Sequence, residues 1–376
     1  MQPLDLASLR SAYGAGTTTP AAILDQVYDA IEKRARMSEL LQAGATGEPG
    51  PQDPTWISRV PREQAHARLV AQLTASASSL PLAGVPFAIK DNIDLAGVPT
   101  TAACPAYAYT PKSSATVVEK LMAAGAVPVG KTNLDQFATG LVGVRTPYGV
   151  PRNPFNAEYI PGGSSAGSAV AVAAGLCSFA LGTDTAGSGR VPAAFNGLVG
   201  LKPTKGLLST RGVVPACRSL DCVSIFTRTC SDAAEVLRVA AGFDAADPFS
   251  RVAFPPAGTA PWPARVGVPR RAQLNFFGNA EAAALFDEAV ARWQKLGATL
   301  VEFDLEPFLA AARLLYEGAW VAERYASLRS FVDSQAEAMH PVTRRIIEGA
   351  RGLSAVDAFT STYRLAELRR GSETVW

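Results

Sequence analysis

The stretches "PGGSSAGSAV" (residues 161–170) and "GTDTAGSGR" (residues 182–190) place two glycine- and serine-rich loops close together in the chain. Glycine permits unusual backbone dihedrals and the close approach of another segment. Such clusters usually mark plain loops. Here the apolar runs "AVAVAAGL" and "VPAAF" follow them, as in buried segments. We therefore expect both loops to be held against a core, which makes their serines candidate nucleophiles.

Composition bounds the classes of protein to which the chain could belong. It has 376 residues, of which 48% are hydrophobic, with 35 basic and 33 acidic side chains. A net charge of +2 provides no electrostatic argument for binding nucleic acid or an acidic membrane surface. The sequence shows neither an apolar run of membrane-spanning length nor the marks of a signal peptide. We predict a globular protein with no nucleic acid and no membrane among its partners.

The counts of cysteine and histidine limit the kinds of active site that are expected. The five cysteines include no CxxC pair, which disfavours a disulfide framework and a metal site and favours reduced thiols in the cytoplasm. They are Cys104, Cys177, Cys217, Cys222 and Cys230. The two histidines, His66 and His340, lie in stretches typical of the surface. If the chain is a serine hydrolase, its base is therefore expected to be a lysine or a carboxylate.

Helix and strand signals alternate along the chain, which predicts an α/β fold with a sheet covered by helices. A helix begins at Pro20 behind a capping Thr19, and a Gly/Pro-rich linker follows at residues 43–54. Residues 84–94 are typical of a buried strand that leaves Lys90 near its end. Further elements are predicted at 62–76, 114–125 (capped by Ser114 and closed by Gly125), 127–130, 231–242, 265–269, 279–297 and 299–304, with helices from Glu306 to Trp376.

The stretch "GAVPVGKT" (residues 125–132) matches the phosphate-loop pattern GxxxxGK[ST]. That motif needs a strand before it and a helix that opens at its Lys-Thr end. Here a predicted helix precedes the stretch, and "VPV" fills the supposed loop with strand formers and a proline that has no N–H. We therefore reject the nucleotide-binding interpretation.

Three motifs together carry a family resemblance: "FAIKDN" around Lys90, then "GGSSAGS", then "DTAGSGRVPAAFNGLVGLKPT". This combination resembles the amidase signature family, whose catalytic unit is a Ser–cis-Ser–Lys triad. The resemblance is strongest over residues 84–237. It implies the fold of that family, a mixed twisted β-sheet covered by α-helices on both faces.

The resemblance assigns roles to individual residues. Lys90 matches the triad lysine, Ser164 the cis-serine and Ser188 the nucleophile. The family forms its oxyanion hole from backbone amides just before and at the nucleophile, which here are those of Thr185, Ala186, Gly187 and Ser188. Asp184 and Arg190 match an ion pair that flanks this turn.

The implied chemistry requires an uncharged lysine. An unperturbed lysine has a pKa of ~10.4, so roughly one in a few thousand is neutral at pH 7. Burial behind the apolar run "VPFAI" would lower the pKa of Lys90 and allow it to act as a base. It would then take a proton from Ser164, which would take one from Ser188.

Two further stretches indicate the substrate. Residues 212–226, "GVVPACRSLDCVSIF", and 315–325, "LYEGAWVAERY", are most similar to the allophanate hydrolases of the family. In those enzymes a tyrosine and an arginine eight residues later bind the substrate carboxylate, and they match Tyr316 and Arg324. On one helix these positions differ by about 80° and would line one side of a pocket. The alternative is an exposed Arg324 paired with Glu317 or Glu323.

The resemblance therefore implies an amide hydrolase that releases ammonia from allophanate through an acyl-Ser188 intermediate, with no metal or organic cofactor. It implies a cytoplasmic homo-oligomer, functionally coupled to a urea carboxylase or a biuret-degrading pathway. One amidase domain is expected over residues 1–376, with a helical part (1–80), a catalytic core (81–242) and a helix-rich substrate side (265–376). Because the family's sheet gains further strands beyond this point, we expect the chain to be truncated at its C-terminus.

Two alternatives remain open. One is another amidase of the family, such as the A subunit of a tRNA-dependent amidotransferase, although "ACRSLDC" and the Tyr316/Arg324 pair argue against it. The other is a catalytically silent binding or scaffold protein. The intact set of Lys90, Ser164 and Ser188 argues against this second alternative.

Overall fold

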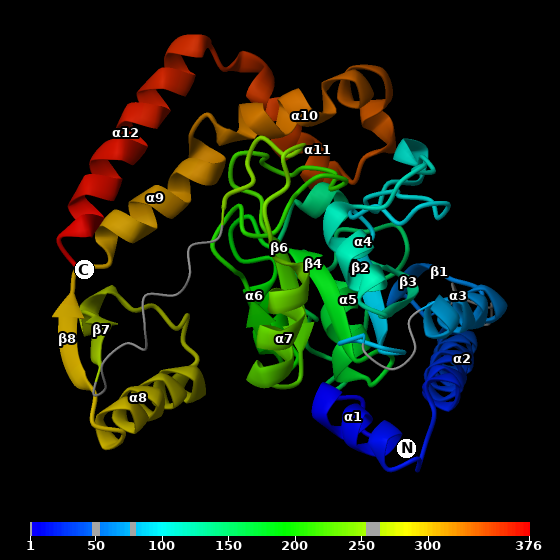
Figure 1. The fold of residues 1–376 in the computed structure, drawn as a ribbon. Helices are drawn as coiled ribbons and strands as arrows, with labels where there is room; N and C mark the ends of the chain where they lie inside the picture. Colours follow the sequence, from blue (N-terminus) through cyan, green and yellow to red (C-terminus); the bar gives the residue numbers. More distant parts are fainter. Residues whose placement is uncertain (1, 47–52, 76–79, 253–263) are drawn as a thin grey trace. The chain divides into compact units, whose positions relative to one another are not determined.

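The computed structural model describes residues 2–46, 53–75, 80–252 and 264–376. Two compact units divide the chain, and each is described by itself (Figure 1). The first comprises Met1–Ala253 and Arg324–Glu348, and the second comprises Phe254–Glu323 and Gly349–Trp376. A single domain over residues 1–376 stays a prediction.

A six-stranded sheet forms the centre of the first unit, with the strand order β1-β3-β2-β4-β6-β5. Its strands are β1 (Trp56–Arg59), β2 (Pro86–Lys90), β3 (Val127–Thr132), β4 (Phe179–Thr183), β5 (Val199–Leu201) and β6 (Val223–Thr227). The strand β2 runs parallel to β3 and β4, whereas the β1–β3, β4–β6 and β5–β6 pairs are antiparallel. The sheet is therefore mixed, as the resemblance implies.

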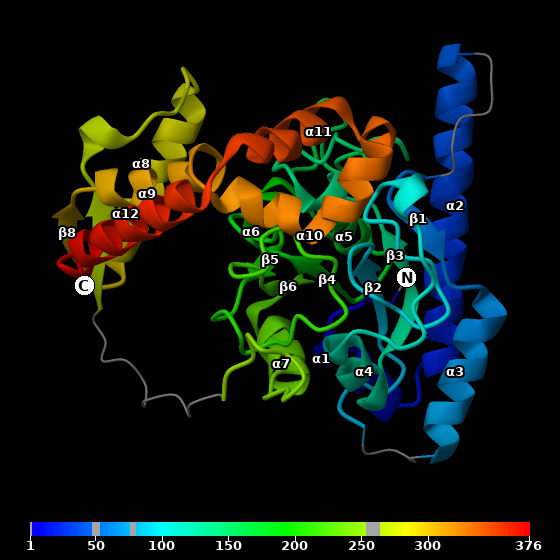
Figure 2. The same cartoon turned by 90° about the horizontal axis from the view of Figure 1, so that it is seen from above.

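Helices cover both faces of this sheet. Every residue of β2, β3, β4 and β6 is buried. Because successive side chains of a strand point to opposite faces, such burial requires cover on both sides. The cover includes α5 (Ala166–Ala173) against β2, β3, β4 and β6, α7 (Cys230–Ala240) against β5 and β6, α3 (Arg62–Ala75) against β3, and α2 (Pro20–Thr46) against β2 (Figure 2). Shorter helices of this unit include α1 (Leu6–Gly14), α4 (Thr116–Ala123) and α6 (Arg190–Phe195).

A second apolar cluster joins the later helices of the first unit to the loops beyond β2 and β3. The helix α10 (Trp320–Gln335) contributes Phe331 to this cluster, and α11 (Pro341–Glu348) contributes Ile347. The ring of Tyr107 packs edge-on against Phe137 and Phe331, at centroid distances of 5.2 and 5.3 Å. Such aromatic pairs add to the free energy gained from burial. The cluster therefore fixes the part of α10 from Arg324 onward over these loops.

The second unit has its own small sheet, in which β7 (Arg265–Pro269) and β8 (Thr299–Phe303) pair in parallel. The helix α8 (Ala280–Lys295) packs against β8, and α9 (Glu306–Glu317) packs against α12 (Ala355–Glu373). A capping box at Ser354 and Asp357 starts α12.

The structure confirms most of the predicted elements and corrects two details. Ser114 does not cap α4, since its hydroxyl instead accepts the N–H of Ala96 at 3.0 Å. The stretch 315–325 is not one helix, because α9 ends before Gly318, whose extended backbone breaks the chain of helical residues ahead of α10. Of the predicted linker, residues 43–46 belong to α2, and residues 47–52 lie outside the described residues.

The nucleotide-binding interpretation of residues 125–132 is excluded, as predicted. The supposed loop is the buried strand β3. Lys131 is fully buried, and its Nζ lies 3.0 Å from Asp91 Oδ1. A lysine paired in this way inside the core cannot bind phosphate.

Candidate active site

Lys90 ends β2 and is fully buried. Its Nζ donates to Ser164 Oγ and to Thr183 Oγ1, both at 2.7 Å. The second contact follows from the sheet, because β2 and β4 run in parallel and end side by side. The first confirms the predicted neighbourhood of Lys90 and Ser164.

Burial lowers the pKa of Lys90 to about 7, and the carboxylates of Asp135, Asp221 and Asp184 oppose this shift. A far larger fraction of the amine is then neutral near pH 7 than at an ordinary lysine pKa. A neutral amine can accept a proton from the hydroxyl of Ser164. Lys90 therefore has the electrostatic environment that a general base requires.

Ser164 follows a cis peptide bond from Gly163 and lies just before α5. A Cβ atom on Gly163 would lie 2.1 Å from Asp135 Oδ2, so no side chain fits there. The Asp135 carboxylate accepts three backbone N–H groups from the loop 142–145, at 2.9 to 3.2 Å. The N–H of Asp135 donates to the Ser164 carbonyl at 3.0 Å. Asp135 thus connects the segment that carries Ser164 to the loop at residues 142–145.

The turn that carries Ser188 leaves the end of β4. Asp184 organises this turn, since its carboxylate accepts the N–H groups of Gly187 at 2.7 Å and of Gly189 at 3.2 Å. Arg190 binds the same carboxylate through Nε and Nη2, both at 2.9 Å, which confirms the predicted ion pair. Ser188 is buried, and its carbonyl accepts the N–H of Ser165 at 3.3 Å. The two serine loops therefore meet.

Backbone amides suited to an oxyanion hole lie in this turn. In the described part of the chain, the N–H groups of Thr185, Ala186 and Ser188 make no hydrogen bond. The N–H of Gly187 differs from these three, because it donates to Asp184 Oδ1 at 2.7 Å. The oxyanion hole expected at Thr185, Ala186, Gly187 and Ser188 stays a prediction.

Arg324 also reaches this region. It lies on α10 with 2% of its surface exposed, and its Nη1 donates to Thr139 Oγ1 at 3.0 Å. The next residue, Gly140, accepts a long hydrogen bond of 3.5 Å from Ser188 Oγ. The interpretation of Arg324 as an exposed residue is therefore wrong. Its guanidinium and the Ser188 hydroxyl contact neighbouring residues of one loop, Thr139 and Gly140.

Tyr316 lies on α9 in the second unit, with 44% of its surface exposed. The expectation that one helix carries both Tyr316 and Arg324 is wrong, because Gly318 separates α9 from α10. A role for Tyr316 in substrate binding stays a prediction.

The two histidines make contacts elsewhere. His66 Nε2 lies 2.9 Å from Asp25 Oδ1, and His340 Nδ1 accepts the N–H of Val342 at 3.3 Å. Among the described residues, neither imidazole makes a hydrogen bond to the three triad residues. This supports lysine as the base.

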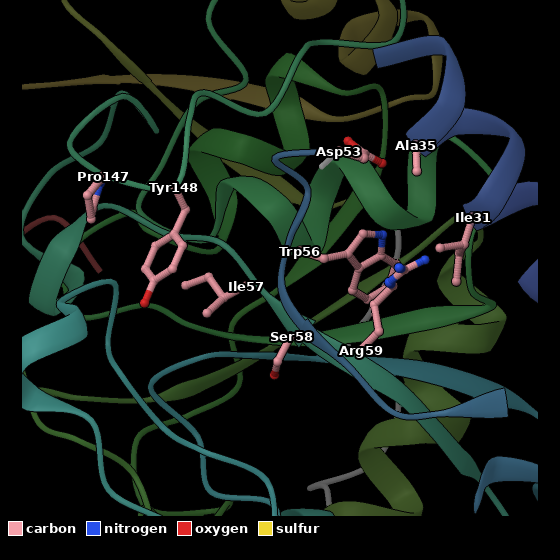
Figure 3. Close-up of a pocket in the computed structure, with 9 residues that line it drawn as sticks. All are labelled: Ile31, Ala35, Asp53, Trp56, Ile57, Ser58, Arg59, Pro147 and Tyr148. Carbon is pink, nitrogen blue, oxygen red and sulfur yellow. The ribbon is translucent and has the colours of Figure 1, made fainter. Parts of the chain in front are cut away.

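Several other features of the described residues lie apart from Lys90, Ser164 and Ser188. A pocket of about 220 Å³ lies between α2, β1 and the segment Pro147–Tyr148, and contains no triad residue (Figure 3). Among the described residues, no group of three or more histidine, cysteine, aspartate or glutamate side chains could hold a metal ion. All five cysteines lie in the described ranges without forming a disulfide, with Cys230 exposed and the others buried. No helix in the described ranges is long and apolar enough to cross a membrane.

The pKa of Lys90 predicts the pH dependence of activity. If Lys90 is the base, the active form has a neutral amine with a pKa of about 7, and kcat/KM should rise as the pH increases through about 7 and level off above it. Measurement of kcat/KM between pH 5.5 and pH 9 tests this expectation. A profile that falls across this range would contradict a lysine base.

Comparisons with known proteins agree with this geometry. The family model described as Amidase matches residues 57–374. Over 334 residues the chain is 49% identical to urea amidolyase from Saccharomyces cerevisiae. This alignment covers 86% of this chain and 18% of that protein. Over 257 residues it is 46% identical to the A subunit of the glutamyl-tRNA(Gln) amidotransferase from Symbiobacterium thermophilum, covering 67% of this chain and 52% of that protein.

A solved structure of Kluyveromyces lactis allophanate hydrolase superposes with a TM-score of 0.89 at 43% identity, covering 100% of this chain and 60% of that one. The chain therefore spans under a fifth of the yeast urea amidolyase and three-fifths of this allophanate hydrolase. Together with the geometry of Lys90, Ser164 and Ser188, the matches show that this chain belongs to the amidase family.

Proposed function

We propose that the chain hydrolyses allophanate and releases ammonia. The observation that carries the proposal is the buried guanidinium of Arg324, which is held at the loop whose carbonyl accepts Ser188 Oγ. Allophanate is a urea derivative with a carboxylate at one end, and arginine binds carboxylates through two parallel hydrogen bonds. Similarity to urea amidolyase and to allophanate hydrolase supports this choice of substrate.

The proposed mechanism begins with proton transfer along the triad. Neutral Lys90 accepts the proton of Ser164 as Ser164 accepts that of Ser188, and Ser188 Oγ attacks the carbon of the terminal amide. The N–H groups of Thr185, Ala186 and Ser188 stabilise the resulting oxyanion. The C–N bond then breaks, and the same relay returns a proton to the departing nitrogen, so that ammonia leaves and an ester remains on Ser188.

A water molecule completes the reaction. It gives a proton to the relay and attacks the ester carbon, and Ser188 leaves with a proton returned by Ser164. The product carries a carboxylate at each end of one nitrogen. None of these steps requires a metal or an organic cofactor.

The direct test is ammonia release from allophanate, biuret, malonamate and glutamine. We expect kcat/KM to be highest for allophanate. Preference for glutamine would instead favour the amidotransferase interpretation, for which there is a relative at 46% identity. If none of the four amides releases ammonia, the result would favour a catalytically silent binding protein.

The chemistry also suggests a metabolic context. An enzyme that carboxylates urea, or one that hydrolyses biuret, would supply the substrate. Five cysteines without a disulfide are typical of a reducing compartment, which supports a cytoplasmic location. Assembly into a homo-oligomer stays a prediction.

Arg324→Lys tests carboxylate recognition. It keeps the charge but loses the planar pair of donors, so kcat/KM for allophanate should fall roughly ten- to a hundredfold. Tyr316→Phe should have a smaller effect, since it removes one neutral hydroxyl. The matched substrate is biuret, which has an amide in place of the carboxylate and should be affected little. Equal losses on both substrates would show that Arg324 is structural.

A further inference from the structure

Among the contacts between the turn that carries Ser188 and other segments of the chain is a side-chain hydrogen bond outside the triad. Thr185 Oγ1 donates to Asp221 Oδ1 at 2.5 Å. Thr185 is the first residue of the turn beyond Asp184, and Asp221 lies just before β6. Neither belongs to the proton relay of the proposed mechanism.

Asp221 is well suited to be a fixed anchor. It is buried, with 5% of its surface exposed, and its carboxylate also accepts the N–H groups of Ala216 at 2.9 Å and Cys217 at 3.1 Å. The N–H of Asp221 in turn donates to the carbonyl of Cys217 at 2.9 Å. The loop 216–221 is thus closed around its own carboxylate, which leaves Asp221 little freedom to move.

The sheet brings this anchor to the turn. Strands β4 and β6 pair as far as Thr183 and Val223, and beyond that pair the N–H of Asp184 donates to the Cys222 carbonyl at 2.7 Å. The turn therefore has two successive attachments to one segment, a backbone bond at Asp184 and a side-chain bond at Thr185.

The backbone around Thr185 and Ala186 has few other restraints. The Asp184 carboxylate holds the amides of Gly187, Gly189 and Arg190, but makes no hydrogen bond with those of Thr185 and Ala186. Thr185 is partly exposed and Ala186 is exposed, so packing restrains them weakly. Threonine is stiff about χ1, and a fixed Oγ1 therefore restricts the orientation of its own backbone.

We infer that Asp221, through the hydroxyl of Thr185, positions the amide donors of Thr185 and Ala186 for the oxyanion. The side chains of Thr185 and Asp221 position these donors and do not themselves contact the reacting atoms. The inference rests on the proposed function, because it needs an amide carbonyl attacked by Ser188. Misplacement of a reacting group by about 1 Å can lower a rate by about a hundredfold. The contact is therefore expected to affect kcat.

The test compares Thr185→Val, which replaces the hydroxyl by a methyl group of similar size, with Thr185→Ser, which keeps the hydroxyl. Thr185→Val should lower kcat about 10- to 100-fold with KM within about threefold. Thr185→Ser keeps the hydroxyl and should therefore lose much less of kcat than Thr185→Val. The loss in the valine variant should be the same for allophanate and biuret, since the hole acts on the carbonyl, and the rise of kcat/KM near pH 7 should not move.

Wild-type kcat in a folded Thr185→Val variant would overturn the inference, as would an equal loss in Thr185→Ser. If the valine variant does not fold, Thr185→Ala gives the same comparison without a methyl group against the carboxylate. A wild-type chain that is inactive on every amide would refute the proposed function instead, so the two failures are distinguishable.

Discussion

Ser188→Ala is expected to abolish ammonia release, with kcat lowered on the order of 10⁴- to 10⁶-fold. The variant has no atom to attack the amide carbon, so no ester can form. The hydroxyl that it loses makes a single long hydrogen bond of 3.5 Å to Gly140 within the described structure. The fold should therefore be unaffected, and Tm should stay within about 2 °C of wild type.

The double variant Ser164→Ala/Ser188→Ala is the informative companion. Residues of a catalytic unit give non-additive losses, so the double variant should be about as inactive as Ser188→Ala alone. Losses that multiply would mean that Ser164 acts outside the relay. Substantial ammonia release by folded Ser188→Ala would remove Ser188 from the mechanism.

Much of this site could be predicted from the sequence because its residues lie in short contiguous motifs. Lys90 follows an apolar run, and Ser164 and Ser188 lie in glycine-rich loops that permit close approach. Each signal is local. The resemblance to the amidase signature family then supplied the roles, and the structure confirms the contact between Lys90 and Ser164.

The remaining contacts depend on pairing between distant segments. Thr183 reaches Lys90 because β2 and β4 end side by side, and Asp221 reaches Thr185 because β6 pairs with β4. A strand's partners do not follow from its own residues. The position of Thr183 at the end of the strand that precedes the turn was a usable signal, whereas nothing near Asp221 points to Thr185.

Competition between local partners explains the incorrect details. Ser114 has the chemistry of a helix cap, but its hydroxyl bonds the N–H of Ala96. Gly318 ends a helix that the surrounding apolar spacing would otherwise continue. In each case the residue type indicated a local role, but the sequence did not show which neighbour or backbone change would decide it.

Lys90→Met and Lys90→Arg should both be nearly inactive, with kcat lowered on the order of 10³- to 10⁵-fold. Methionine matches the length of lysine but cannot accept a proton. Arginine keeps hydrogen-bond donors for Ser164 and Thr183, but its pKa lies above about 12, so it too is never a base near neutral pH. Measurement of kcat for both variants therefore separates proton transfer from simple support of the two hydroxyls. Activity of Lys90→Arg within about tenfold of wild type would make Lys90 a structural donor.

The histidine variants complete this argument. His66→Ala and His340→Ala should each retain activity within about threefold of wild type, because their imidazoles bond Asp25 and Val342 rather than the triad. The rise in kcat/KM near pH 7 should persist in both, since it reports the amine of Lys90, whose burial lowers its pKa to about 7. A histidine with an ordinary pKa of ~6.5 would give a similar rise in kcat/KM, so the pH profile must be combined with the variants to identify the base. Retention of the rise in both histidine variants, together with the inactivity of Lys90→Arg, assigns the base to Lys90.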